Sequence, residues 1–252
     1  MADHYSDLAG EYDWLYDDDA LTYGVAITRP AVTGLLQRLG PGSAVLDAAC
    51  GIGLDAAALA RRGFHVRASD GSHAMVEVAA ARFGREGLAI PVQQCLWADL
   101  PDTFDERFDV VLCTGNALVH AAGADAMVAA LTGLRRMARP GGHVVIHSRN
   151  WEKLHAERRI VQVANQVRTR GGRRCVMFYA WEVPDRLDQE HVAHIVFLFA
   201  DGDRIEPHEY RISLLPVTLG EVRVRLELAG LREVSTDFVE TADDYVVIAM
   251  PA

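Results

Sequence analysis

Residues 45–53 are Val45-Leu46-Asp47-Ala48-Ala49-Cys50-Gly51-Ile52-Gly53, a short apolar run that ends in small residues and glycines. This pattern predicts a buried strand that turns tightly into a helix. Glycine has no Cβ and tolerates positive φ, so such a turn lets a nucleotide-like ligand approach the backbone. We therefore expect a ligand-binding turn at this point of the chain.

A second strand is predicted over Phe64–Ala68, and it leads to Ser69-Asp70-Gly71-Ser72. Asp70 follows the first strand by about one βαβ unit, where a carboxylate accepts hydrogen bonds from both hydroxyls of a ribose. The two motifs together indicate an adenosine-type cofactor. Because Gly51-x-Gly53-x-x-Ala56 also satisfies the relaxed dinucleotide fingerprint, NAD is an alternative here, and a purely structural turn is a third interpretation.

The bulk properties favour a globular protein that acts on something other than nucleic acid. The chain has 252 residues, enough to bury a large core, and we expect one domain with an insertion. Its formal net charge of −10 argues against a polyanion as the main partner. One group of arginines surrounds Gly171-Gly172 and is interpreted as a solvated hairpin tip; it consists of Arg168, Arg170, Arg173 and Arg174.

Neither a membrane nor a metal ion is expected as a partner. The sequence lacks a run of about 18 apolar residues and an N-terminal basic region followed by an apolar one, so we expect a cytoplasmic protein. His191 and His194 lie three residues apart in a strand-like run and so point to opposite faces. The cysteines are isolated and are expected to be reduced and buried; they are Cys50, Cys95, Cys113 and Cys175.

Strands and helices are predicted to alternate over residues 28–150, which indicates a parallel sheet with helices on both faces. The expected elements are helix Thr28–Leu39, strand Ala44–Ala48, helix Asp55–Arg62, strand Phe64–Asp70, helix Ala74–Gly84, strand Ile90–Cys95, strand Asp109–Cys113, helix Ala124–Ala138 and strand His143–His147. Ligands of such sheets bind beyond the carboxyl ends of the strands. The stretches that this rule brings to one edge are Asp47–Gly53, Asp70, Leu96–Trp97, Thr114–Asn116 and Ser148–Asn150.

The pattern changes after Trp151. Residues 151–217 form an insertion with runs typical of antiparallel hairpins, expected over Ile160–Thr169, Arg173–Val183, His191–Ala200 and Ile205–Leu215. This insertion lies near the crevice, where it can form a lid. A helix over Thr218–Ala229 and strands over Leu231–Val239 and Tyr245–Met250 return the chain to the core. The core is therefore assigned to residues 28–150 and 218–252.

Residues 1–27 are rich in acidic and aromatic side chains. One interpretation is a packed N-terminal helix. The other is an arm whose aromatic rings close over a cation, because aromatic faces attract positive charge.

These features together resemble class I S-adenosylmethionine-dependent methyltransferases, and more narrowly the glycine and glycine/sarcosine N-methyltransferase group. Residues 45–53 are similar to the first motif of the family, and residues 69–72 with Met75 are similar to its ribose and adenine region. The narrower signals are Gly115-Asn116 with His120, Arg149-Asn150 before an aromatic residue, the hairpin insertion and Asp3-His4-Tyr5. The resemblance implies an α/β fold with a Rossmann-like seven-stranded methyltransferase sheet and an antiparallel β-hairpin insertion after strand five.

The resemblance also implies a role for individual residues. The implied contacts to S-adenosylmethionine are Ala49, Gly51, Asp70, Gly71, Met75, Leu96, Trp97, Thr114, Trp14 and Tyr16. The implied catalytic and substrate-side residues are Asn116, Arg149, His120, Tyr5 and Tyr179. In this scheme Arg149 binds the carboxylate of an amino-acid substrate and Asn116 accepts a hydrogen bond from its amine. Members of the group can be homo-oligomers, so the resemblance allows that state as well.

Methyl transfer from a sulfonium requires neither a metal nor a covalent nucleophile, because the methyl carbon is already activated. The protein has to align the acceptor, and orientation alone can contribute about 7–11 kcal/mol. His147 and Trp151 stand where the family usually has an acid and a tyrosine, and an acid–base role for His147 stays open. Both changes affect the substrate side, so a larger or more apolar amine is an alternative to glycine or sarcosine.

The leading hypothesis is thus a small-molecule N-methyltransferase. A natural-product methyltransferase that acts on nitrogen, oxygen or carbon with a rebuilt pocket is the first alternative. An NAD-dependent oxidoreductase and a non-catalytic cofactor-binding module are the others.

Overall fold

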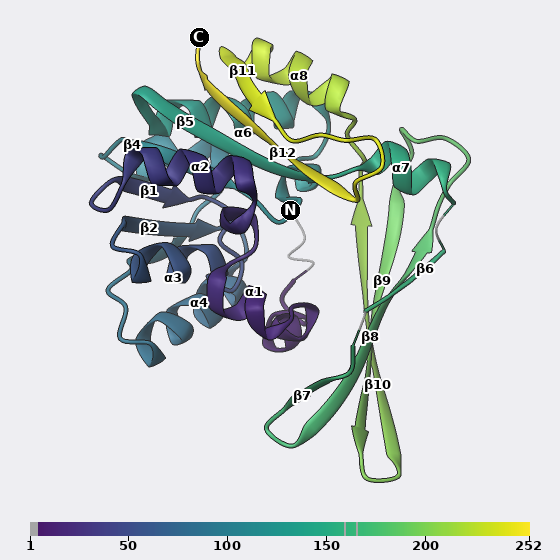
Figure 1. Cartoon of the computed structure of the whole chain (residues 1–252). Helices are drawn as coiled ribbons and strands as arrows, with labels where there is room; N and C mark the ends of the chain where they lie inside the picture. Colours follow the sequence, from purple (N-terminus) through teal and green to yellow (C-terminus); the bar gives the residue numbers. More distant parts are fainter. Residues whose placement is uncertain (1–4, 159, 165) are drawn as a thin grey trace.

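The computed structural model describes residues 5–158, 160–164 and 166–252. Asp3 and His4 of the N-terminal motif lie outside this range. At the centre stands a seven-stranded sheet with the order β11-β12-β5-β4-β1-β2-β3 (Figure 1). Its strands are β1 (Ala44–Asp47), β2 (His65–Asp70), β3 (Val92–Gln94), β4 (Phe108–Cys113), β5 (Ala138–Arg149), β11 (Leu231–Thr236) and β12 (Asp244–Pro251).

The strands from β1 to β5 pair in parallel, β12 runs antiparallel to β5, and β11 closes the edge as a hairpin with β12. This topology confirms the predicted Rossmann-like methyltransferase sheet and its terminal hairpin. It brings the carboxyl ends of β1, β2 and β4 to the same edge, where ligands of such sheets bind.

Helices cover both faces of the sheet. α2 (Pro30–Leu39), α3 (Leu54–Arg61) and α4 (His73–Arg85) pack on one face, and α6 (Ala124–Met137) and α8 (Leu219–Leu228) pack on the other. β4 is buried along its whole length because Val110 and Leu112 face the first layer while Val111 and Cys113 face the second. The shorter helices are η1 (Ala9–Leu15), α1 (Asp18–Tyr23), η2 (Ala26–Thr28), η3 (Trp97–Asp99), α5 (Leu100–Thr103), η4 (Ala117–His120) and α7 (Trp151–Ala156).

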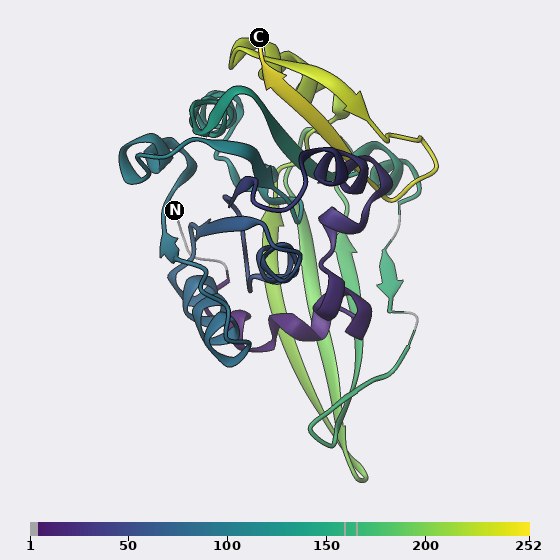
Figure 2. The ribbon, with the colours of Figure 1, turned by 60° about the vertical axis from the view of Figure 1, so that its left-hand side comes forward.

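A second, antiparallel sheet follows α7 and has the order β10-β9-β8-β6, with β7 paired to the first part of β8. Its strands are β6 (Val161–Val163), β7 (Arg168–Arg170), β8 (Arg173–Glu182), β9 (His191–Asp201) and β10 (Arg204–Leu214). Figure 2 shows that the N-terminal segment runs between this sheet and the main body. Met177, Ile195 and Phe197 on the inner side of the sheet belong to the same apolar core as α6.

Two predicted boundaries were wrong. β5 begins at Ala138 rather than His143, because Pro140-Gly141-Gly142 lies inside the strand. The register with β4 shifts between Phe108 and Val110, which absorbs the extra residues as a bulge. The run predicted as one strand over Ile160–Thr169 forms two short strands, β6 and β7, which pair with different parts of β8.

The interpretation of the arginine group as a solvated tip was also wrong for two of its members. Arg168 donates to the backbone carbonyl of Trp14, and Arg170 donates to those of Asp13 and Tyr16, both at 2.7 Å. These arginines bind the N-terminal segment from the β7–β8 hairpin. Sequence pattern did not indicate this contact because the partners lie more than 150 residues away and offer backbone atoms.

In the part of the chain that the structure describes, no helix combines the length and apolarity that a membrane crossing requires. The same residues contain no group of three or more His, Cys, Asp or Glu side chains that could hold a metal ion. His191 is buried, whereas His194 lies on the opposite face of β9 between Glu182 and Glu209. All four cysteines are free and buried.

Candidate active site

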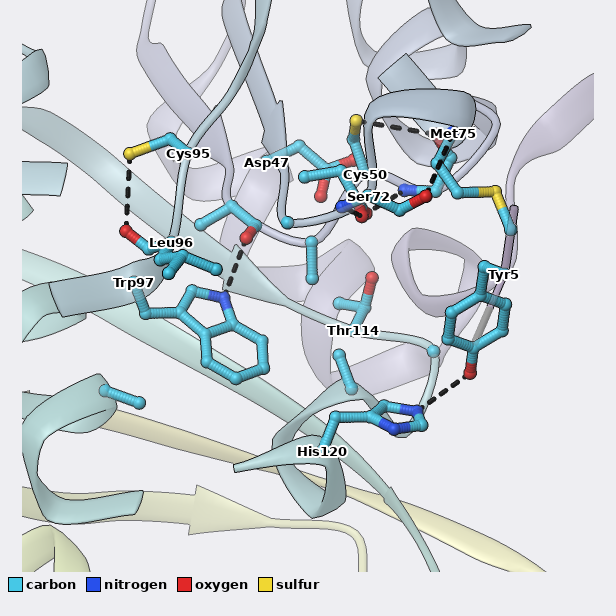
Figure 3. A pocket seen from close by; sticks show the side chains of 18 of the residues that line it. Tyr5, Asp47, Cys50, Ser72, Met75, Cys95, Leu96, Trp97, Thr114 and His120 are labelled. Carbon is cyan, nitrogen blue, oxygen red and sulfur yellow. Dashed lines mark hydrogen bonds between the residues drawn. The ribbon is translucent and has the colours of Figure 1, made fainter. Parts of the chain in front are cut away.

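A cavity of about 520 Å³ opens at the carboxyl edge of β1, β2 and β4, and the N-terminal segment closes one side of it (Figure 3). A volume of this size suits a cofactor or a drug-sized ligand. Most of the predicted site residues line it: Tyr5, Tyr16, Ala49, Gly51, Asp70, Gly71, Met75, Leu96, Trp97, Thr114 and His120. Trp14, Asn116, Arg149 and Tyr179 are not among the lining residues.

The turn after β1 orients the carboxylate of Asp70. The Gly51 N–H donates to Asp70 Oδ2 at 2.8 Å, and the Ser72 N–H donates to Asp70 Oδ1 at 2.9 Å. Gly53 has a φ of +81°, and a Cβ there would lie 2.6 Å from the Phe83 ring of α4. The glycines therefore allow both the left-handed turn and the close approach of α4 that bring Asp70 to the cavity wall.

Asp47 and Asp55 lie beside Asp70 on the same wall, and both are buried. Burial raises the pKa of Asp47 well above its usual range, and the neighbouring Asp55 and Asp70 raise it further. Oδ1 of Asp47 has no hydrogen-bond partner among the described residues. A positively charged ligand in the cavity would stabilise the ionised form of this carboxyl group, so the wall is suited to a cation.

Asp55 connects this wall to the N-terminal segment. Its carboxylate accepts hydrogen bonds from the backbone N–H of Val25 at 2.6 Å and of Ala26 at 3.2 Å, and from the Thr114 hydroxyl at 3.3 Å. Burial raises the pKa of Asp55, and the backbone donors oppose that shift. Sequence reasoning missed Asp55 because two of its partners lie about 30 residues upstream and the third lies 59 residues downstream. Its place in the first turn of α3 was the signal that could have found it.

Apolar groups form the other side of the cavity. Met75 is buried, and Leu96, which is 48% exposed, lies next to Gly71. The Trp97 indole donates from Nε1 to the carbonyl of Ala48 at 2.8 Å, which fixes the ring against the end of β1. A flat apolar slot beside a carboxylate matches an adenine ring next to its ribose.

Three tyrosines of the N-terminal segment face the cavity. The rings of Tyr5 and Tyr16 each lie 5.8 Å from that of Tyr12, which sequence reasoning did not assign to the site. The Tyr5 hydroxyl is 2.8 Å from Nε2 of His120 at the end of η4 (Figure 3). Burial raises the pKa of all three phenols, so they stay neutral and present aromatic faces to the ligand. These contacts favour the arm interpretation over a helix that only packs.

Trp14 does not have the position that the resemblance implied. Its ring packs against Phe199 of β9 at 5.2 Å, and the guanidinium of Arg170 lies over it at 5.0 Å. The side chain is buried between the N-terminal segment and the second sheet. Because consecutive residues of a 3₁₀ helix point in different directions, Tyr12 faces the cavity and Trp14 faces the second sheet.

The predicted substrate-side residues gather just outside the cavity. The guanidinium of Arg149 lies 5.0 Å from the Trp181 ring and 5.7 Å from the Tyr179 ring, and Nη1 contacts Gln162 Oε1 at 3.3 Å. Asn116 has a left-handed backbone, and its Oδ1 accepts a hydrogen bond from the Arg149 N–H at 3.0 Å. That bond uses one of the two lone pairs of the oxygen that was predicted to face the amine, so Asn116 also holds the backbone of Arg149.

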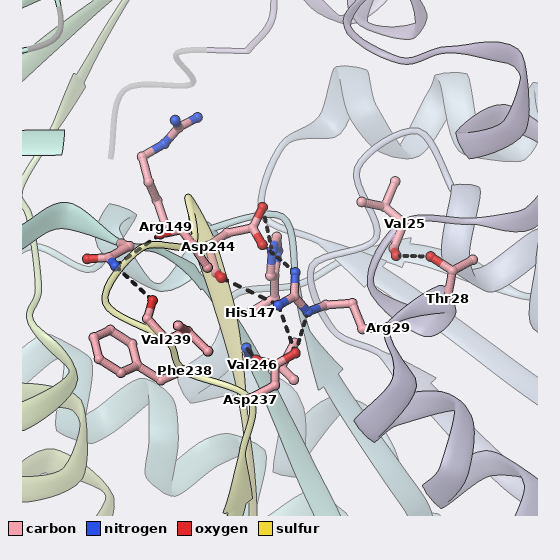
Figure 4. A network of polar contacts seen from close by, with 12 residues as sticks. Val25, Thr28, Arg29, His147, Arg149, Asp237, Phe238, Val239, Asp244 and Val246 are labelled. Carbon is pink, nitrogen blue, oxygen red and sulfur yellow. Dashed lines mark hydrogen bonds and ion pairs between the residues drawn. The ribbon is translucent and has the colours of Figure 1, made fainter. Parts of the chain in front are cut away.

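His147 belongs to a polar network rather than to the cavity wall (Figure 4). Its Nε2 lies 3.7 Å from Asp244 Oδ2, and Arg29 contacts Asp244 and donates to Asp237 at 2.8 Å. His147 and, to a lesser degree, Arg29 lower the pKa of Asp244 to about 2. The network ties the start of α2 to the β11–β12 hairpin, so we assign His147 a positioning role.

A histidine–glutamate contact joins η1 to β10. His208 Nδ1 lies 2.8 Å and 2.9 Å from the two carboxylate oxygens of Glu11, which also accepts a hydrogen bond from Tyr210 at 3.0 Å. Glu11, together with Glu206, raises the pKa of His208. A raised histidine pKa contributes stability below the unfolded-state value of about 6.5, and that contribution is lost as pH rises through the folded value.

We therefore expect amide exchange in residues 9–15 to increase from pH 6 to pH 9 by more than the intrinsic chemical rate predicts. Hydrogen exchange with mass spectrometry measures this, and His208→Gln is the control because it removes the titration. An equal pH response in the wild-type protein and in His208→Gln would contradict the assignment.

The order of the main sheet, the glycine turn and the carboxylate at the end of β2 are the arrangement that the resemblance to class I S-adenosylmethionine-dependent methyltransferases implies. The cavity fits the cofactor because its lining combines buried carboxyl groups with an apolar slot.

Comparisons with known proteins support that assignment. Residues 45–142 match the methyltransferase domain family. The chain is 26% identical over 224 residues to glycine/sarcosine N-methyltransferase of Parasynechococcus marenigrum (strain WH8102), which covers 85% of this chain and 73% of that enzyme. It is 30% identical over 168 residues to human glycine N-methyltransferase, which covers 61% of this chain and 56%, a little over half, of that enzyme.

A solved S-adenosylmethionine-dependent methyltransferase from Clostridium acetobutylicum ATCC 824 has the same fold, with a TM-score of 0.74 and 15% identity. The superposition covers 98% of each chain, including the second sheet. The domain match and the curated relatives together support a class I methyltransferase that uses S-adenosylmethionine, and the solved structure shares its fold.

Proposed function

We propose that this protein transfers a methyl group to the amine of a small molecule that carries a carboxylate. The proposal rests on the contacts of the Arg149 side chain. Its guanidinium lies against the rings of Tyr179 and Trp181 outside the cavity lining, and among the described residues no carboxylate forms an ion pair with it. A half-buried arginine of this kind is suited to bidentate recognition of a carboxylate.

The cofactor side of the site is proposed as follows. Asp70 accepts hydrogen bonds from the ribose, and Met75, Leu96 and Trp97 enclose the adenine. The backbone at Ala49 and Gly51 approaches the methionine end, and Thr114 lies beside it. When bound, S-adenosylmethionine supplies a methyl group activated by a sulfonium, and the acidic wall with its tyrosine cover favours this cation over the neutral product.

The substrate side is proposed to align the acceptor and exclude water. Arg149 anchors the carboxylate, and the stacked rings of Tyr179 and Trp181, 5.8 Å apart, support the guanidinium from one side. The hydrogen-bonded pair of Tyr5 and His120 is placed to receive the proton that the amine loses. On this model residues 1–27 form the cover and residues 151–217 form the substrate wall, whereas 28–150 and 218–252 hold the cofactor.

The relatives give this proposal further support, since both curated enzymes described above are named for methylation of the nitrogen of glycine or sarcosine. Trp151 stands where the family usually has a tyrosine, and its ring packs against Trp181 beside Arg149, so the acceptor of this chain can be larger than glycine.

Mass spectrometry of reactions with S-adenosylmethionine and a panel of acceptors tests the function. The panel holds glycine, sarcosine, dimethylglycine, larger amino acids, amino sugars, and amino and hydroxy heterocycles. We expect a gain of one or more methyl groups on a carboxylate-bearing amine. Transfer to hydroxyl acceptors alone would contradict the proposal that the acceptor is an amine. Saturable cofactor binding without any turnover would contradict the enzymatic function.

Replacement of Arg149 tests the anchor. We expect Arg149→Ala to raise KM for a carboxylate-bearing amine by about 10- to 100-fold, because hydrogen bonds between charged groups contribute about 1.5–3 kcal/mol. The Kd for S-adenosylmethionine should stay within about twofold, since the side chain lies outside the cavity lining. Arg149→Lys is the control, because it keeps the charge and loses the planar fork. Unchanged KM in both variants would contradict the assignment.

A further inference from the structure

Arg149 is a half-buried cation whose polar contacts, among the described residues, are to neutral groups. Its backbone N–H donates to Oδ1 of Asn116 at 3.0 Å, and its Nη1 donates to Oε1 of Gln162 at 3.3 Å. The guanidinium also lies 5.0 Å from the centre of the Trp181 ring. Acidic partners are plentiful in a chain with 35 Asp and Glu against 25 Lys and Arg, and buried arginines are normally paired with them. The fold therefore leaves the positive charge of Arg149 uncompensated.

The acid that pairs with Arg149 in the main sheet is occupied by other basic groups. Asp244 lies directly opposite Arg149 in the pairing of β5 with β12. Its carboxylate contacts the guanidinium of Arg29 and lies 3.7 Å from Nε2 of His147. Figure 4 shows that the guanidinium of Arg149 is directed away from this network. Asp244 therefore does not neutralise Arg149, although the two residues are neighbours in the sheet.

Gln162 lies on β6, the edge strand of the second sheet, and faces the substrate side of the site. It pairs with Tyr179 of β8, and paired residues share a face of the sheet. Its neighbours Val161 and Val163 point to the opposite face and are 52% and 57% exposed. Gln162 is thus the one polar side chain of β6, and it is half-buried where it contacts Arg149.

An amide at position 162 orients the guanidinium without cancelling its charge. A guanidinium has five N–H donors, and the bond to Gln162 uses one of those on Nη1. Among the described residues, no acceptor contacts the edge that Nε and Nη2 of Arg149 form, and this edge offers the two parallel donors that a carboxylate needs. A glutamate at position 162 would form an ion pair with Arg149 instead and would compete with the carboxylate of an acceptor.

We propose that Gln162 is a positioning residue that sets the charge of the acceptor. It holds the guanidinium of Arg149 in place and leaves it cationic, so the site selects an amine with a carboxylate over the neutral form of the same amine. This inference rests on the proposed function and adds to it the residue that determines selection by charge. Gln162 does not line the cavity, so its replacement should leave the Kd for S-adenosylmethionine unchanged.

Steady-state kinetics with sarcosine and its primary amide, sarcosinamide, test the proposal. Gln162→Glu should raise KM for sarcosine by about 10- to 100-fold, the range that a lost hydrogen bond between charged groups gives, and should leave kcat within about twofold. KM for sarcosinamide should stay within about twofold, because this acceptor has no carboxylate to compete. Gln162→Met removes the hydrogen bond without adding a charge and should raise KM for sarcosine by only about threefold. Gln166→Glu is the matched control, since it adds the same charge at an exposed position beyond β6.

The outcomes separate this inference from the proposed function. A wild-type protein that methylates sarcosinamide as well as sarcosine would contradict the carboxylate acceptor. A wild-type protein that requires the carboxylate, together with a Gln162→Glu variant whose KM for sarcosine is unchanged, would overturn only the role of Gln162. An equal rise of KM for both acceptors in Gln162→Glu would mean that the residue is merely structural. If sarcosine is not methylated, the amino acid of the panel with the highest turnover and its primary amide replace the pair.

A second measurement reports on Arg149 without any turnover. Phenylglyoxal modifies arginine through the neutral guanidine, and an ion pair makes that form rarer by stabilising the cation. Peptide mapping by mass spectrometry should therefore show slower modification of Arg149 in Gln162→Glu, by about threefold or more, and a wild-type rate in Gln166→Glu. Equal rates in the wild-type protein and in Gln162→Glu would overturn the proposal, whatever the acceptor is.

Discussion

Asp70→Ala is expected to weaken binding of S-adenosylmethionine by about 100-fold or more. The carboxylate is held by the N–H groups of Gly51 and Ser72, and we propose that it accepts hydrogen bonds from both ribose hydroxyls. Hydrogen bonds to a charged group contribute about 1.5–3 kcal/mol each, and 1.4 kcal/mol corresponds to a factor of ten. Calorimetric titration with S-adenosylmethionine measures the change.

Two further variants serve as controls for the effect of Asp70→Ala on cofactor binding. Asp70→Asn keeps one carbonyl oxygen for the turn or the ribose, so its loss of affinity should be smaller than that of Asp70→Ala. Arg149→Ala should bind the cofactor like the wild type. A folded Asp70→Ala variant whose Kd lies within about threefold of the wild-type value would show that the ribose contact lies elsewhere.

Gly133→Ala is expected to destabilise the protein and damage the cofactor site together. Gly133 lies in α6, where a Cβ would be 2.0 Å from the backbone carbonyl oxygen of Trp97. Alanine normally favours a helix by about 1 kcal/mol over glycine, but a clash with the backbone forces η3 to move, and overpacking typically costs about 1–3 kcal/mol. Since Trp97 lines the cavity, its displacement should also raise the Kd for S-adenosylmethionine.

Gly84→Ala is the matched control, because Gly84 lies in α4 with no atom within 4 Å of the added Cβ. We expect Gly84→Ala to raise the melting temperature slightly and Gly133→Ala to lower it by several degrees, as about 1 kcal/mol shifts a chain of this size by about 2–4 °C. Calorimetry and cofactor titration on both variants test this. A Gly133→Ala variant that is as stable as Gly84→Ala would mean that η3 moves away from the added Cβ without loss of stability, which would contradict the prediction.

Local sequence patterns predicted most elements of the main sheet, on which the candidate cofactor site lies. The run from Val45 to Gly53 predicted β1 and its turn, and Asp70 followed from the spacing of one βαβ unit. The continuous apolar run of β4 predicted a central strand, because a strand buried on both faces needs no alternation. These features depend on residues close in sequence, where backbone geometry and hydrophobic periodicity suffice.

The strand boundaries that were predicted wrongly depend on pairing with other strands. Pro140-Gly141-Gly142 is a stop signal by itself, yet the bulge opposite Phe108 keeps β5 continuous through it. Ile160–Thr169 is apolar enough for one strand, and the pairing with two parts of β8 divides it.

The contacts that close the site could be found only in the tertiary structure. The sequence determined that tyrosines precede a methyltransferase sheet and that a hairpin insertion follows it. Only the folded chain brings Asp55 to the backbone of Val25, Tyr5 to His120, and Arg170 to Trp14. Each of these contacts joins segments whose separation no local pattern encodes, and the first uses a backbone N–H that almost every residue has. The physical reason is that propensity and periodicity act over one or two turns, whereas the site is assembled by burial across the whole chain.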